Sequence, residues 1–225
     1  LDSAALTWQK EQKCFTCHTN FAYLFARPTA SSDNTAHQQV REFAEELVRE
    51  RWPKEGPRWD AEVVATAAAL SFNDSATTGK LQPLTRTALN RMWTVQQEHG
   101  GWNWLKCDWP PMESDDHYGV TLAAIAVGVA PEDYAETPAA QKGLTGIRRY
   151  LRDNPPRTLH HRAMWLWVAT VRDAGGGRTT AARCGVAEDT PTRKREMVYA
   201  LPQSGQHALH HARRNGHGHH GAVSM

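Results

Sequence analysis

The chain has 225 residues, of which 40% are hydrophobic and 22% are charged, and its formal net charge at pH 7 is +2. This length is sufficient for a sizeable hydrophobic core, and the nearly neutral charge balance excludes a strongly basic nucleic-acid-binding arm. The longest apolar stretch, around residues 120–130, is too short to cross a bilayer as a helix. Four cysteines are too few for a disulfide scaffold: Cys14, Cys17, Cys107 and Cys184.

Hydrophobic periodicity predicts an all-α chain in which two kinds of helix alternate. The predicted pairs are residues 5–13 with 20–27, 36–50 with 60–72, 84–97 with 117–130, and 138–153 with 159–171. In the later pairs the first helix has a charged face and the second is apolar nearly all round, which is typical of an outer and a buried inner helix. Such a pair buries its apolar face only when neighbouring pairs stack on it, so we expect an α/α array.

The character of the chain changes after Gly175-Gly176-Gly177. The following sequence lacks helical periodicity, and its last part is rich in His and Gly. We therefore predict a helical domain over residues 1–172, followed by an irregular or disordered segment over residues 173–225.

Two motifs lie between the third outer and inner helices. Gln97-x-x-Gly100-Gly101-Trp102 follows the outer helix, and Glu113-Ser114-Asp115-Asp116 directly precedes the inner one. With the apolar segment LHHRAMWLWVAT over residues 159–170, they resemble the bacterial squalene-hopene cyclase and prenyltransferase-like α/α-toroid family. In that family a Gln and a Trp tie a helix end to the following turn, and an Asp-x-Asp-Asp motif opens an inner helix.

The resemblance covers roughly residues 1–172 and implies an α/α toroid. Four helix pairs are fewer than a closed toroid of this kind normally needs, so we expect the toroid to be incomplete. The resemblance further implies a class II terpene cyclase-like domain that acts on, or binds, a long isoprenoid.

Cyclisation of a polyene by protonation requires an unusually strong carboxylic acid that is protonated when the substrate arrives. Clustered carboxylates achieve this because two like charges close together cannot both ionise. The resemblance implies that Asp115 is the proton donor and Asp116 its partner, while Glu113 stands where the family has its first Asp. We expect the longer side chain of Glu113 to displace the hydrogen bond that orients the acid.

The same residues also have a structural interpretation, which the sequence leaves open. Ser114, Asp115 and Asp116 stand just before an apolar helix, where N-cap residues and first-turn acids are favoured. Aromatic faces around an apolar cavity would stabilise a cation, although Trp and Tyr at helical spacing are more often core residues. The candidates are Trp102, Trp104, Trp109, Tyr118, Trp165 and Trp167.

The segment Cys14-Phe15-Thr16-Cys17-His18 has the Cys-x-x-Cys-His pattern that attaches a c-type haem. The two thiols would form thioethers with the haem vinyl groups, and His18 would be an axial ligand of the iron. An attached haem implies a location outside the cytoplasm, in the periplasm or at a membrane surface, where this attachment takes place in bacteria. The same position in the later helix pair is occupied by Gly100-Gly101-Trp102, so the motif falls in a turn between an outer and an inner helix.

Other uses of these cysteines remain open. Cys14 and Cys17 suit a redox dithiol, a zinc site with His18 and a fourth ligand, or an ordinary helix turn. The sequence therefore leaves two functional classes: a terpene cyclase-like enzyme, or a haem-carrying or lipid-binding module on the same scaffold without cyclase activity. The expected partner is a long isoprenoid or another apolar small molecule, with membrane-surface association as an open alternative and no nucleic acid.

Overall fold

The all-α fold that the sequence predicts is confirmed by the structure, a computed structural model that describes residues 2–13, 20–30, 35–106 and 115–171. These residues form helices and turns, with no strand among them. The α-helices are α1 (Asp2–Gln12), α2 (Asn20–Ala30), α3 (Thr35–Glu46), α4 (Trp52–Glu55), α5 (Asp60–Thr77), α6 (Pro83–Thr94), α7 (Asp116–Val129), α8 (Pro138–Asp153) and α9 (Leu159–Thr170). A π-helical turn, η1 (Leu47–Arg51), joins α3 to α4, and a 3₁₀ turn, η2 (Tyr134–Glu136), precedes α8. The segment predicted to be irregular lies outside the described residues.

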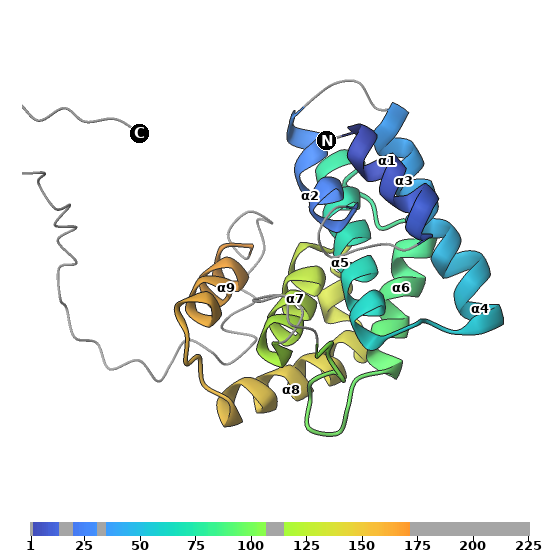
Figure 1. The fold of residues 1–225 in the computed structure, drawn as a ribbon. Coiled ribbons are helices and arrows are strands. Elements are labelled where there is room, and N and C mark those ends of the chain that lie inside the picture. Colours follow the sequence, from blue (N-terminus) through green and yellow to red (C-terminus); the bar gives the residue numbers. More distant parts are fainter. Residues whose placement is uncertain (1, 14–19, 31–34, 107–114, 172–225) are drawn as a thin grey trace, which may run out of the picture. The chain divides into compact units, whose positions relative to one another are not determined.

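The helices form two layers. In the inner layer α5 packs against both α2 and α7, and α7 packs against α9. In the outer layer α1 packs against α3, the η1 turn reaches α6, and α6 packs against α8. Figure 1 shows the inner helices in chain order from α2 (blue) through α5 and α7 to α9 (orange). Each successive pair therefore adds one helix to each layer.

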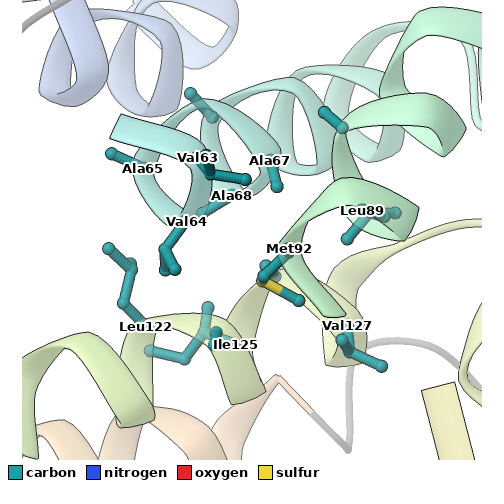
Figure 2. Close-up of a cluster of buried hydrophobic side chains, with 14 of the residues drawn as sticks. Val63, Val64, Ala65, Ala67, Ala68, Leu89, Met92, Leu122, Ile125 and Val127 are labelled. Atoms are coloured by element: carbon teal, nitrogen blue, oxygen red, sulfur yellow. The ribbon is translucent and has the colours of Figure 1, made fainter. Parts of the chain in front are cut away.

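The core consists mainly of α5 and α7, the two helices that are apolar nearly all round. Every residue is buried over residues 61–71 of α5 and over residues 117–127 of α7. Figure 2 shows Val64 of α5 near Leu122 and Ile125 of α7, with Met92 of α6 beside them. Burial of each such aliphatic side chain stabilises the fold by about 1.5–3 kcal/mol. Small alanines at the contact let the two helices approach closely.

The inner layer is curved, because its first and last helices also meet. The Trp167 ring of α9 lies 5.8 Å from that of Phe25 in α2 and 5.7 Å from that of Phe72 in α5, measured between ring centroids. Phe25 and Phe72 pack edge to face at 4.1 Å. These three rings form an aromatic contact between helices that are far apart in the sequence.

Two predicted helices differ in detail from the structure. The helix predicted over residues 36–50 changes from α to π geometry after Glu46. The predicted inner helix α9 is apolar, yet Leu159 and Leu166 are 81% and 69% exposed, and Met164 and Val168 are its buried residues. Among the described helices α9 is the last of the inner layer, so no further inner helix covers its outer face.

Close packing in the outer layer depends on a glycine of α8. A Cβ atom placed on Gly143 would lie 2.1 Å from a ring carbon of Trp93, which belongs to α6. The Trp93 ring is held in position because its Nε1–H donates to the Tyr134 hydroxyl at 3.0 Å. The Tyr134 hydroxyl in turn donates to Asn90 at 2.9 Å.

We predict that Gly143→Ala lowers the free energy of unfolding by about 1–3 kcal/mol, because the added methyl group overpacks the contact with Trp93. Gly128→Ala is the matched control, since Gly128 is also inside a helix and its Cβ would meet only the Val171 side chain, at 3.2 Å. Both variants gain helix propensity. Urea denaturation measures the difference, and equal stability of the two variants would contradict this packing.

Candidate acid site at the start of two inner helices

The turn after α6 is tied to the helix end by Trp102. The Trp102 side chain is 2% exposed, and its indole N–H donates to the carbonyl of Met92 at 3.1 Å. This bond satisfies one of the carbonyls that a helix end leaves free. Trp102 therefore packs the turn.

The glutamine that spans this turn is Gln96, which the sequence analysis missed. Its Nε2 donates to the carbonyl of Gly100 at 2.9 Å and to that of Gly143 in α8 at 3.1 Å. The Gln97 side chain donates to the carbonyl of Val95, within its own turn. The adjacent Gln-Gln pair gave no signal in the sequence to distinguish the two, because their roles depend on where α8 lies.

Asp115 is the N-cap of α7. One carboxylate oxygen, Oδ1, accepts the backbone N–H of His117 at 3.0 Å. The other, Oδ2, lies 2.7 Å from Nε2 of His161, near the start of α9. The tertiary structure thus brings together two residues that are 46 positions apart, and the carboxylate joins the starts of two neighbouring inner helices.

The hydrogen bonds of His161 define how it meets Asp115. The backbone N–H of Arg157 points to Nδ1 of His161 at 3.3 Å, so Nδ1 acts as the acceptor. In the neutral imidazole the proton then resides on Nε2, which donates to the carboxylate of Asp115. The Asp115 and His161 side chains are 21% and 15% exposed, so the pair is largely shielded from solvent.

Asp116 has a different environment from Asp115. Its side chain is 39% exposed and forms an ion pair with Lys106. It lines a surface hollow of about 360 Å³ whose lining does not include Asp115. The other residues around this hollow are Asp60, Gln97, His99, Trp102, Asn103, Trp104 and Lys106. The third predicted member of the carboxylate cluster, Glu113, lies outside the described residues.

Aromatic and imidazole rings surround the Asp115–His161 pair. The His117 ring stacks on that of His161 with a centroid distance of 4.1 Å and an angle of 6° between the planes. The centroid of the Trp165 ring lies 6.1 Å from that of the His117 ring. His160 stacks on Tyr118 at 5.6 Å. We call these residues the ring cluster: His117, Tyr118, His160, His161 and Trp165.

His117 is held in its neutral form. Its side chain is buried, with 4% of the residue exposed. Burial, together with the neighbouring His161, lowers the pKa of His117 from 6.5 to about 4, while Asp115 opposes the shift. The imidazole of His117 is therefore uncharged at neutral pH.

The aromatic residues that the sequence analysis grouped together separate in the structure. Trp165 belongs to the ring cluster, and Trp104 packs against Tyr118 at 6.0 Å. Trp167 instead belongs to the contact with Phe25 and Phe72. Trp109 lies outside the described residues.

The fully buried carboxylates of α5 are structural. Asp74 pairs with Arg41 at 2.7 Å and accepts the backbone N–H of Gln82 at 2.8 Å. Glu62 pairs with Arg51 and accepts the indole N–H of Trp52 at 2.8 Å. Both carboxylates therefore join the inner helix to the outer layer, each with an arginine, whereas Asp115 pairs with an imidazole.

The described residues contain no group of three or more His, Cys, Asp or Glu side chains that could hold a metal ion. The predicted haem residues Cys14, Cys17 and His18 lie outside the described part of the chain. Within that part, no helix is long and apolar enough to span a bilayer.

Comparison with known protein families, with curated proteins and with solved structures finds no significant match. The chemistry of the site therefore follows from its own residues. Asp115 is distinguished from the buried carboxylates of α5 by its imidazole partner and by the rings beside it.

We predict that acidification destabilises the protein partly through His117. Because its pKa is about 4 when folded and 6.5 when unfolded, the unfolded state binds more protons between these values, and stability falls as the pH drops through this window. Between pH 7 and pH 4.5 the wild type should lose about 2 kcal/mol more than His117→Phe. Urea denaturation at both pH values measures this, and equal losses would show that His117 ionises freely in the folded state.

Proposed function

We propose that the chain is a class II terpene cyclase-like domain that protonates a long isoprenoid, with Asp115 as the acid. The observation that carries this proposal is the placement of the Asp115 carboxylate between the start of α7 and the imidazole of His161. The predicted partner Asp116 pairs with Lys106 instead. We therefore assign the supporting role to His161.

Three features stabilise the carboxylate that remains after Asp115 has given up its proton. The backbone N–H of His117 and Nε2–H of His161 donate to its two oxygens. The N-terminus of α7 adds the favourable end of the helix dipole. Two donors and a helix end therefore face the negative charge that the proton transfer leaves on Asp115.

The proposed step is a proton transfer to carbon. The proton leaves the Asp115 carboxyl group, and the electron pair of a terminal double bond forms the new C–H bond. The neighbouring carbon becomes cationic and is attacked by the next double bond, until loss of a proton ends the reaction. Trp165 and Tyr118, the aromatic residues of the ring cluster, would stabilise the cation. Solvent reprotonates Asp115, whose side chain is 21% exposed.

We also propose that the two layers belong to an incomplete α/α toroid. The alternate outer and inner helices and the approach of α2 to α9 through Phe25 and Trp167 support this arrangement. In such an arrangement the inner helices present one end to the substrate. Asp115 and His161 lie at that end, where α7 and α9 begin.

Asp115→Asn should abolish conversion of squalene to cyclic products, with a loss of about a thousandfold, because the amide cannot donate the proton. Asn still caps a helix, so the fold is retained. Asp60→Asn is the matched control, since Asp60 lies in the first turn of α5 and its carboxylate also accepts a backbone N–H, from Asn103 at 2.9 Å. Product analysis measures both, and equal turnover by wild type and Asp115→Asn would remove Asp115 as the acid.

We propose as a second function that Cys14, Cys17 and His18 carry a c-type haem. The specific support is the complete Cys-x-x-Cys-His sequence in the segment that joins outer helix α1 to inner helix α2. A haem bound to this segment would be an addition to the two-layer helical fold.

Protein co-expressed with the bacterial haem-attachment machinery should show a Soret band and the mass of one covalent haem. Cys14→Ser/Cys17→Ser should lose both signals, since the thioether bonds need both thiols. Cys107→Ser is the control and should retain them. A colourless wild-type protein of unshifted mass would exclude the haem.

A further inference from the structure

The ring cluster contains buried nitrogen atoms that have no hydrogen-bond partner among the residues that the structure describes. Both ring nitrogens of His117, Nε2 of His160 and Nε1 of Trp165 are in this state. His161, in the same cluster, uses both of its nitrogens, one with Asp115 and one with Arg157. The unused nitrogens therefore belong to the residues around the proposed acid.

The rings that carry these nitrogens belong to one cluster. The His117 ring is 4.1 Å from that of His161 and 6.1 Å from that of Trp165, and the His160 ring is 6.4 Å from that of His161. They come from the start of α7 and the first half of α9. A buried polar group without a partner costs free energy, and a phenylalanine would stack equally well at His117. The cost of leaving nitrogens unpartnered on three neighbouring rings would be removed if a polar group bound among these rings.

The types of nitrogen limit what this group is. A neutral imidazole has one donor and one acceptor, and an indole has one donor. His117 is neutral at physiological pH, since its pKa is about 4. A hydroxyl group both donates and accepts, so it satisfies this mixed set. A carboxylate or phosphate would only accept, and a pure hydrocarbon would leave every nitrogen unpaired.

We propose that the nitrogens of His117, His160 and Trp165 form a binding site for the hydroxyl group of an isoprenoid alcohol. The isoprenoid part of this ligand rests on the proposed function, whereas the hydroxyl rests on the unpartnered nitrogens. Bound in this way, the hydroxyl would take the place beside Asp115 and His161 that the terminal double bond takes in the proposed reaction, so the alcohol would compete with that substrate.

The test compares two ligands that differ in one group: geranylgeraniol and the hydrocarbon with the same skeleton and a hydrogen in place of the hydroxyl. Equilibrium binding to the full chain should favour the alcohol about five- to tenfold, the effect of one or two satisfied hydrogen bonds. Equal affinities would show that solvent satisfies these nitrogens and would overturn the proposal.

Variants locate the preference in the cluster. His117→Phe keeps a stacking ring but removes both nitrogens, and Trp165→Phe removes only the indole N–H. Each should reduce the preference for the alcohol, measured as the ratio of the affinities of the same variant for the alcohol and for the hydrocarbon. His99→Phe is the control, because the His99 ring packs against Tyr150 at 5.6 Å, outside the ring cluster, and it should retain the preference. An undiminished preference in both cluster variants would place the hydroxyl elsewhere and overturn the proposal.

The outcome is separable from that of the cyclase test. Binding that prefers the alcohol, with no cyclic product from squalene, would support this site and remove only the proposed reaction. Squalene turnover that depends on Asp115, without a preference for the alcohol, would overturn this site alone. Failure to bind either ligand would overturn the site and remove the isoprenoid from the proposed function as well.

Discussion

The burial of α5 on all sides is the constraint on which the rest of the structure depends. A helix whose residues 61–71 are all buried must be covered by neighbours on every face, and α2, α6 and α7 supply the main contacts. Covering α5 in this way requires an inner and an outer layer. Helix α7 must also be covered by neighbouring helices, because it is buried over residues 117–127, and α9 packs against it in addition to α5.

The layered packing also explains why a polar site forms at the helix starts. Helix interiors satisfy their own backbone groups, but the first N–H groups of each helix need other acceptors. Asp115 supplies one to α7, and because α9 begins beside α7, its second oxygen reaches His161. The N-cap and the acid interpretations of Asp115 are therefore compatible. One oxygen holds the helix start, and the other meets a residue of the next pair.

The glycines of the outer layer show how closely the pairs stack. Gly143 leaves room for Trp93, and Gly100 lies so near α8 that a Cβ atom there would collide with the carbonyl of Gly146. Gly100 also has a φ of +93°, which favours glycine. Gln96 spans the same contact by donating to Gly100 and Gly143. The turn with Trp102 thus joins successive pairs as well as closing one helix.

The sequence by itself determined the helices and their order, because hydrophobic periodicity is local: α8 has the predicted bounds, Pro138–Asp153, and α5 was expected to be buried. It also predicted Asp115 at a helix start, since capping depends on near neighbours. Only the tertiary structure decided that Asp115 meets His161, that Asp116 pairs with Lys106, and that Gln96 reaches α8. The Asp115 contact joins residues 46 positions apart and the Gln96 contact joins residues 47 positions apart. All three contacts depend on how helices and turns pack against one another, which periodicity does not encode.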